Sequence, residues 1–373
     1  MRTRQLIDPQ TQKIWSTQCE GAIVFVGSGA EGKVKITEKP QADKNAAIAW
    51  AEKEEWARLK KGFILNNPSA KAGEPRMHFY RGRGYTGALP VFDVEGKMFC
   101  SIYDETASRD KVFLLSESAE VTRLPELPQN RLIWKGFYQM ALKKLLLLAD
   151  HQILSLDLDE NHFVAMTEPN QQPVSCLHIS EDRAVWYEEP DLLVTDLTNN
   201  QTLLRLPMQY ETYSGHSPQM AAVLSPDGNT LACCVHSGEI LLIDISTGKI
   251  FDKLTGKFAM IAEMAFTADS RYLIASEQYG EWKLLCFDIN TLFLRTDWLN
   301  IKNLGTTEFA ISATGSHIAI AQRSSIDIYD LTHFKKELSF KVEHTAKKCT
   351  MAWVDEWLGV QTDYGCASLY ATR

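Results

Sequence analysis

A glycine-rich stretch near the start of the chain has the spacing of a nucleotide-binding loop. Residues 27–34 read Gly-Ser-Gly-Ala-Glu-Gly-Lys-Val and fit the pattern G-x-G-x-x-G-x-V. In a dinucleotide-binding fold the third glycine opens a helix, whose N-terminus binds the pyrophosphate. Here Lys33 to Thr37 continue as an alternating strand, and the His-Arg-Asp and Asp-Phe-Gly elements of a kinase do not occur. We therefore interpret the glycines as the turn of a β-hairpin and expect no cofactor.

The other reactive residue types form no catalytic or metal-binding pattern. The nine histidines are spread singly, without His-Glu-x-x-His, and the eight cysteines contain no Cys-x-x-Cys pair. Cys233 and Cys234 fall in the middle of an expected strand, where one thiol should point to each face. The sequence also lacks a Gly-x-Ser-x-Gly nucleophile elbow. We expect a protein that is not an enzyme, with no catalytic, cofactor-binding or metal-binding residues.

Positive charge is concentrated near the N-terminus. The net charge is −8, yet residues 1–72 carry 12 Lys/Arg against 8 Asp/Glu, and the remainder carries 27 against 39. Because phosphate contacts need positive charge, the acidic remainder argues against nucleic-acid binding by the whole chain. The candidate nucleic-acid contacts are five basic residues of the first segment: Lys33, Lys35, Arg58, Lys60 and Lys61.

A second basic patch follows the first segment and includes an aromatic residue. Arg81, Arg83 and Tyr85 alternate with glycines. Such residues can stack on or clamp an anionic partner, which makes these three our candidate partner contacts. The alternative interpretation is a flexible linker that carries a few charges.

From about residue 86 onward one pattern recurs: short apolar strands separated by turns rich in Asp, Gly or Ser. The fullest copy, residues 221–250, contains the turn sequences Ser225-Pro-Asp-Gly and Ser246-Thr-Gly. The third strands of successive copies end at intervals of 39 to 48 residues, close to the length of a four-stranded propeller blade. These seven ends are Ser116, Asp157, Asp196, Asp244, Asp288, Asp330 and Ala371. The sequence therefore predicts a mainly β fold with a seven-bladed β-propeller.

The repeats resemble those of WD-repeat propellers. Gly215-His216 precedes Ile243-Asp244 at the spacing of that family's Gly-His and Trp-Asp dipeptides, and Ile328-Tyr-Asp330 is a similar strand end. The resemblance covers about four-fifths of the chain. The copies lack the Trp of Trp-Asp, and Ser237-Gly238 replaces the usual Asp turn of the fullest copy. The resemblance implies a rigid ring for docking proteins, without the family's full hydrogen-bond tetrad.

The end of the chain suggests how the ring closes. Residues 367–373 match a third strand, after which the sequence stops, and a blade without its outer strand would expose an edge. WD-like propellers borrow this strand from the N-terminal end of the array. We expect residues 76–81 to pair with residues 367–372, so that the propeller spans residues 76–373 and residues 66–75 form a linker.

The first segment, residues 1–72, reads as a small α+β domain. Strands are expected at residues 13–15, 22–26 and 33–37, and a helix at residues 45–61 with Ala46, Trp50, Ala57 and Leu59 as its apolar face. Ala49-Trp-Ala-Glu-Lys and Leu59-Lys-Lys-Gly-Phe63 resemble the helix of WGR domains, which implies a sheet-and-helix module. In polymerase members of that family, the Trp and Arg help to engage broken DNA. This chain has Val26-Gly27-Ser28 in place of Trp-Gly-Arg.

These observations define three alternative functions. The first is a non-enzymatic protein-interaction scaffold whose propeller docks partner proteins. The second is a nucleic-acid-associated protein that uses the basic WGR-like module, and the third is a propeller enzyme or small-molecule binder. No apolar run approaches the ~18 residues needed to cross a membrane. Scattered cysteines favour free thiols and a cytoplasmic location.

Overall fold

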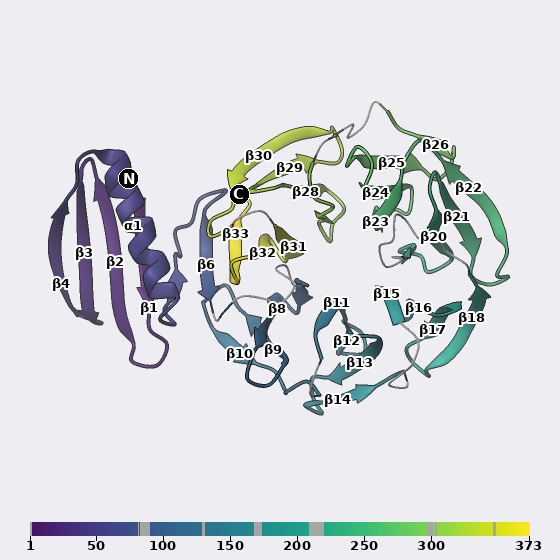
Figure 1. Cartoon of the computed structure of the whole chain (residues 1–373), viewed down its shortest axis with the longest axis horizontal. Coiled ribbons are helices and arrows are strands. Elements are labelled where there is room, and N and C mark those ends of the chain that lie inside the picture. The colour runs from purple at the N-terminus through teal and green to yellow at the C-terminus, as the bar shows by residue number, and fades with distance from the viewer. Residues whose placement is uncertain are drawn as a thin grey trace.

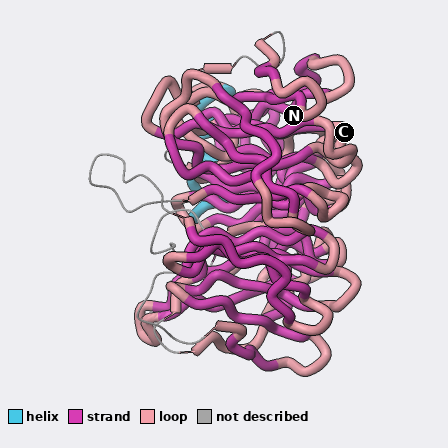
Figure 2. Tube along the Cα trace, turned by 90° about the vertical axis from the view of Figure 1, so that its right-hand side faces the viewer, coloured by secondary structure: helices cyan, strands magenta, loops and turns pink. Residues whose placement is uncertain are grey.

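The computed structural model describes residues 2–80, 82, 90–128, 131–167, 174–208, 220–296, 301–302, 304–345 and 348–373. The described strands form a ring of sheets, and a small module of strands and one helix lies at one side of the ring and continues one of its sheets (Figure 1). A view at right angles shows how completely strands dominate the described ring (Figure 2). No described helix is both long and apolar enough to cross a membrane.

Six blades are four-stranded antiparallel sheets, each formed by one continuous stretch of chain. Blades 1 and 2 consist of β7 (Phe92–Val94), β8 (Lys97–Asp104), β9 (Arg109–Leu115) and β10 (Val121–Arg123), then β11 (Ile133–Gln139), β12 (Lys144–Ala149), β13 (Gln152–Asp157) and β14 (His162–Ala165). Blades 3 and 4 consist of β15 (Val174–Ser180), β16 (Arg183–Glu188), β17 (Asp191–Asp196) and β18 (Gln201–Pro207), then β19 (Ala221–Leu224), β20 (Thr230–His236), β21 (Glu239–Asp244) and β22 (Ile250–Thr255). Blades 5 and 6 consist of β23 (Met260–Phe266), β24 (Tyr272–Gln278), β25 (Leu284–Asp288) and β26 (Phe293–Leu294), then β27 (Phe309–Ile311), β28 (His317–Gln322), β29 (Ser325–Asp330) and β30 (Lys335–Lys341).

The closing blade, blade 7, joins the two ends of the array. It contains β31 (Cys349–Val354), β32 (Trp357–Thr362) and β33 (Cys366–Ala371), and its fourth strand is β6 (Pro75–Tyr80). β6 lies antiparallel to β33, with His78 opposite Ser368 and Met77 opposite Leu369. The seven-bladed propeller expected from the repeat spacing is confirmed.

Each blade packs against the next through an apolar core, and seven such cores follow one another around the ring. The middle strands are therefore buried on both faces, which explains apolar runs such as Leu145–Ala149 in place of alternation. Cys233 faces the core between blades 3 and 4, and Cys234 the core between blades 4 and 5, as expected for neighbours on a strand.

The N-terminal module continues the closing blade. β1 (Arg2–Ile7), β2 (Lys13–Glu20), β3 (Ile23–Ala30), β4 (Lys33–Pro40) and β5 (Ile64–Asn66) extend it beyond β6, giving a nine-stranded sheet in the order β31-β32-β33-β6-β5-β1-β2-β3-β4. The sequence analysis missed β1. The segment expected to be a linker is instead the connection between paired strands β5 and β6, and Gly73 N–H donates to the Ala371 carbonyl at 2.8 Å.

Helix α1 (Lys44–Leu59) packs on β1, β2 and β3. Asp43 caps its N-terminus by accepting a hydrogen bond from Ala46 N–H at 2.8 Å. Of the expected apolar face, Leu59 is confirmed as buried, whereas Ala46, Trp50 and Ala57 were wrong, because the other fully buried side chains are Ala47, Ala51 and Glu55. Their four-residue spacing places the Glu55 carboxylate on the buried face of the helix.

The glycine-rich stretch is the β3–β4 hairpin, as interpreted from the sequence. Gly32 has a φ of +72°, which favours glycine in the turn. A Cβ at Gly27 would lie 2.4 Å from Ser16 Oγ, so this glycine permits close packing between the strands.

Candidate functional site: a buried polar junction

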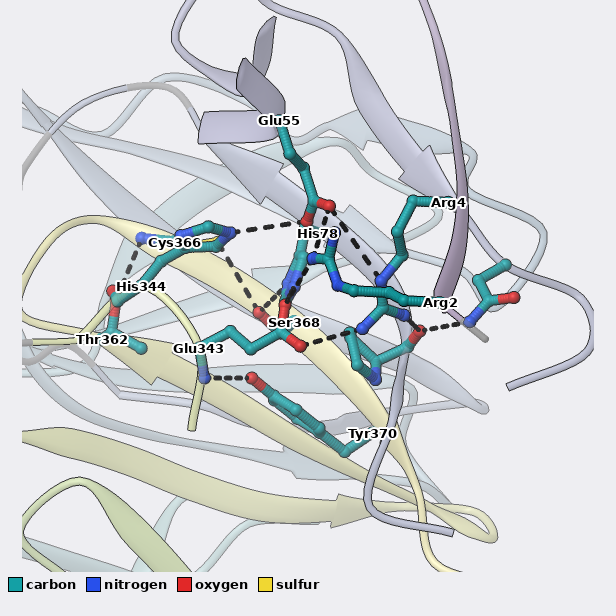
Figure 3. A network of polar contacts seen from close by, with 12 residues as sticks. Arg2, Arg4, Glu55, His78, Glu343, His344, Thr362, Cys366, Ser368 and Tyr370 are labelled. Carbon is teal, nitrogen blue, oxygen red and sulfur yellow. Dashed lines mark hydrogen bonds and ion pairs between the residues drawn. The ribbon is translucent and has the colours of Figure 1, made fainter. Parts of the chain in front are cut away.

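A network of polar side chains lies where the N-terminal module meets the closing blade (Figure 3). Four segments contribute the charged and imidazole side chains of this polar junction. Its six charged or imidazole side chains are Arg2 and Arg4 of β1, Glu55 of α1, His78 of β6, and Glu343 and His344 after β30. The junction thus joins residues from the beginning and the end of the chain.

Each junction carboxylate is held by one guanidinium group. Arg2 Nη2 donates to Glu55 Oε2 at 2.8 Å, and Arg4 Nη2 donates to Glu343 Oε1 at 2.8 Å. The Glu55 side chain is fully buried and Arg4 is 4% exposed, whereas the side chains of Arg2 and Glu343 are 15% and 24% exposed, so each pair is partly shielded from solvent. Opposite charges in such an environment attract strongly, which offsets the cost of removing them from water.

Each of the two histidines lies beside one junction carboxylate. His78 Nδ1 is 2.7 Å from Ser368 Oγ, and His78 Nε2 is 3.1 Å from Glu343 Oε2. His344 Nε2 is 3.6 Å from Glu55 Oε1, and its ring stacks on Trp56 of α1 at 4.6 Å between centroids. The helix therefore contacts the closing blade through both a polar and an aromatic side chain.

Opposing effects set the charge states in the junction. Burial raises the pKa of Glu343, but the hydrogen bond to His78 and the charges of Arg4 and Arg2 outweigh it and hold this pKa well below its usual range. Burial likewise raises the pKa of Glu55, whereas His344 and Arg2 lower it, with a net decrease. Burial lowers the pKa of His78 despite its bond to Glu343. At neutral pH, two carboxylates and two guanidiniums therefore balance around an uncharged His78.

The junction contains no activated nucleophile among the described residues. Cys366 lies beside Ser368, with Sγ 3.6 Å from Oγ, but burial raises the pKa of this thiol to about 12. Burial also raises the pKa of Cys234 to about 11, and it raises the pKa of Cys233 well above its usual value. These thiols remain protonated at neutral pH, in agreement with their interpretation as core residues.

The inner strands carry a second, partly buried polar group. Lys135 of β11 donates to Glu263 Oε2 of β23 at 2.8 Å, which connects blade 2 with blade 5 across the ring. Burial and the Glu263 charge raise the pKa of nearby Glu308 to about 8.

The candidate nucleic-acid contacts fall at one side of the N-terminal module. Lys33 and Lys35 lie on the exposed strand β4, and Arg58 lies near the end of α1. The Arg58 guanidinium is 5.5 Å from the centre of the Trp15 ring, and Trp15, Ser28 and Lys35 form one cross-strand row. Arg58 and Lys35 therefore share a face of the sheet. Lys60 lies over Trp56, at 5.9 Å, and Lys61 is exposed beyond the helix end.

Two groups of residues named in the sequence analysis cannot be placed. The candidate partner contacts Arg81, Arg83 and Tyr85, and the Gly215-His216 dipeptide, lie outside the described residues.

Sequence reasoning missed all six charged or imidazole residues of the junction. A signal existed for Glu55, since it continues the four-residue spacing of Ala47, Ala51 and Leu59. A signal also existed for His78, which lies between Met77 and Phe79 in an apolar strand. Arg2, Arg4, Glu343 and His344 carry no local pattern that would have identified them.

By structural similarity the chain is a WD40-like β-propeller. No protein-family model and no curated protein sequence matches it. A chain in the crystal structure of the mitotic checkpoint complex is 11% identical, with a TM-score of 0.62, and the match covers 82% of this chain and 93% of that one. The β-propeller domain of Cps50 (Swd1) from Myceliophteria thermophila is 16% identical, with a TM-score of 0.58, and the match covers 79% of this chain and 98% of that domain. At such identities the similarity shows the fold alone.

Proposed function

We propose that this protein is a non-enzymatic interaction scaffold whose propeller docks partner proteins. The observation that carries the proposal is the fixed attachment of the N-terminal module, through a continuous nine-stranded sheet and a buried ion-pair junction. A rigid ring with a rigidly attached side module presents its surfaces in constant positions, as a docking platform requires. The similar propeller in the mitotic checkpoint complex belongs to a multiprotein assembly.

The outer edge of the ring offers a surface for a protein partner. Phe251 on β22 and Phe293 on β26 are 53% and 73% exposed, and these strands are neighbours in blades 4 and 5. Ile250 is also half exposed beside them. Exposed aromatic side chains that lie close together are typical of protein-binding surfaces. We assign this Phe251/Phe293 surface to a protein partner that presents apolar side chains.

The test is a reconstitution with purified components. Partners crosslinked to the full chain in its native host would be identified by mass spectrometry and then purified. Isothermal titration of the chain with each partner should give a stoichiometric complex, with affinity at least tenfold lower for a Phe251→Asp/Phe293→Asp variant. A Val164→Asp/Leu203→Asp variant changes exposed apolar residues on the outer strands of blades 2 and 3 and should bind normally. Absence of any stoichiometric complex would refute the scaffold, and equal affinity of both variants would refute this surface.

A second candidate function is nucleic-acid binding by the N-terminal module. It is supported by the common face of Arg58 and Lys35 and by the resemblance of the helix to that of WGR domains. Val26 and Ser28 stand where that family has Trp and Arg, and Val26 packs half-buried towards α1. We therefore propose that specific affinity for DNA ends is absent at physiological salt.

Fluorescence anisotropy with labelled blunt, nicked and single-stranded DNA checks this proposal. Residual binding through lysines should weaken steeply as salt rises, because it depends on counterion release. A salt-resistant, tight complex that a Lys35→Glu/Arg58→Glu variant loses would establish nucleic-acid binding. The matched control is Lys249→Glu/Lys335→Glu, which removes two exposed lysines of the propeller.

A further inference from the structure

Four residues of the polar junction direct ligand atoms to one point. Glu55, His78, Glu343 and His344 each place a carboxylate oxygen or imidazole nitrogen within 4.8 Å of those of the other three (Figure 3). They come from α1, β6 and the segment after β30, so they meet only in the folded chain. Two imidazoles with two carboxylates are a ligand set that suits zinc and similar divalent ions.

Two of these atoms lack a hydrogen bond although they are buried. Glu55 Oε1 and His344 Nε2 face each other at 3.6 Å, and neither has a hydrogen-bond partner among the described residues. The Glu55 side chain is fully buried, and that of His344 is 10% exposed. Buried polar atoms without partners are rare, and an unfilled ion site is one reason for them. At 3.6 Å the two atoms are too far apart to form a direct hydrogen bond with each other.

The outer atoms of the same residues are held in the manner of metal ligands. Glu55 gives its Oε2 to Arg2 and Glu343 gives its Oε1 to Arg4, so that each carboxylate keeps its other oxygen for the centre. His78 bonds Ser368 through Nδ1, which fixes the ring and turns Nε2 inwards. Hydrogen bonds of this kind orient ligands and fix the histidine tautomer.

We propose that Glu55, His78, Glu343 and His344 form a four-coordinate site for a divalent transition ion of the zinc type. Bonds of about 2.0–2.1 Å to a tetrahedral zinc separate neighbouring ligand atoms by roughly 3.3 Å. The observed pairs lie on both sides of that value: His78 Nε2 to Glu343 Oε2 is 3.1 Å, and His344 Nε2 to Glu55 Oε1 is 3.6 Å. The other ligand pairs must approach by up to about an ångström and a half from the 4.8 Å limit.

The charges around the site determine its affinity for a divalent ion. The two carboxylates neutralise the ion. Of the carboxylate oxygens, only the outer ones accept hydrogen bonds from the guanidinium groups, although Arg2 Nη2 also lies 3.9 Å from Glu343 Oε2. Their nearby positive charges lower the affinity relative to a site without arginines. The ion would tie α1 to the closing blade, and this role is independent of which partner the scaffold binds.

Metal binding to the full chain tests the proposal directly. Protein stripped with a chelator should bind one Zn²⁺ or Co²⁺ per chain, raise its melting temperature, and give the visible absorption of tetrahedral Co²⁺. Glu55→Gln and His344→Gln should each weaken binding at least tenfold. His317→Gln is the matched control, because His317 forms a surface pair with Glu337 at 3.1 Å.

Anomalous diffraction from crystals grown with Zn²⁺ keeps the test decisive if a variant fails to fold. A peak between the four side chains would establish the site. No uptake by the unaltered chain, or uptake that both junction variants retain, would overturn it. A peak elsewhere would also overturn it.

Discussion

Blade 4 and the closing blade have the same four-strand layout but differ in what holds them together. Blade 4 is one continuous stretch, and its middle strands bury Leu and Ile side chains on both faces. The closing blade combines strands from opposite ends of the chain, and His78 and Ser368, which are 290 positions apart, contact each other within it. Local chemistry is therefore enough to shape blade 4, whereas the closing blade depends on long-range contacts.

The difference extends to buried charge. The carboxylates at the edge of the closing blade each have an arginine partner. Between blades 1 and 2, by contrast, the buried Asp110 accepts a hydrogen bond from Ile133 N–H at 2.8 Å, and its other oxygen accepts none from the residues that the structure describes. Paired buried charges fix two elements relative to each other, while a lone buried carboxylate mainly destabilises the folded state.

Removing the closing strand should have the largest effect. Deleting residues 1–72 removes the N-terminal module, and deleting residues 1–82 also removes β6, whose Met77 and Phe79 are buried in the core between blades 7 and 1. The lost burial of these two side chains and of the strand pairing should lower stability by a further ~4 kcal/mol or more. Urea unfolding of both truncations measures the difference. Equal midpoints would mean that β6 does not hold the ring closed.

Breaking one buried ion pair should have the next largest effect. Arg4→Met removes the guanidinium that is hydrogen-bonded to Glu343, leaving Arg2 at 3.9 Å as the remaining cation, and should lower the free energy of unfolding by about 2–3 kcal/mol. The control is Arg205→Met, which breaks the Arg205–Asp191 pair on blade 3; there the N–O distance is 2.6 Å and the Arg205 side chain is 62% exposed. That change should cost at most about 1 kcal/mol. Similar losses in the two variants, measured by urea unfolding, would show that burial does not distinguish the pairs.

Neutralising the lone carboxylate should increase stability, in a pH-dependent way. Burial raises the pKa of Asp110 from 3.8 to about 6, so the folded protein binds this proton more tightly than the unfolded chain. Protonated Asp110 is thus favoured at low pH, and this contribution is lost as the pH rises through about 6. A rise of two pKa units means that ionised Asp110 lowers the free energy of unfolding by about 3 kcal/mol at neutral pH. Asp110→Asn should recover roughly half of this loss, because the N–H groups of the asparagine side chain themselves need hydrogen-bond partners.

Thermal unfolding of Asp110→Asn and the unaltered protein at pH 4.5 and pH 7.5 checks this expectation. The variant should be more stable at pH 7.5 and nearly equal at pH 4.5. A variant that is less stable at both values would indicate that the carboxylate has an essential charged partner.

The contrast between local and long-range contacts also determines which parts of the structure can be predicted from the sequence. The blades follow from local chemistry: Asp157, Asp196 and Asp330 each end a third strand and accept a hydrogen bond from an N–H group two residues later. The interval between such ends sets the number of blades. The junction could not be predicted in this way, because Arg4 and Glu343 meet only after the ring has closed. Glu55 shows the limit most clearly, since a charged residue on a helix is ordinarily assigned to the solvent face.

A turn in blade 4 should show the smallest effect, since its contacts are local and exposed. Asp227 accepts a hydrogen bond from Asn229 N–H at 3.1 Å in the turn between β19 and β20, and its partner Ser225 accepts one from Thr230 N–H at 2.9 Å. Blade 5 repeats the arrangement with Asp269, and its Oδ1 accepts from Arg271 N–H at 3.1 Å. Asp227→Ala should cost about 0.5–1 kcal/mol, because water replaces part of each lost hydrogen bond. Asp269→Ala, as the matched change, should cost the same within error by urea unfolding. A loss as large as that of Arg4→Met would contradict the division between locally shaped blades and a closing blade held by long-range contacts.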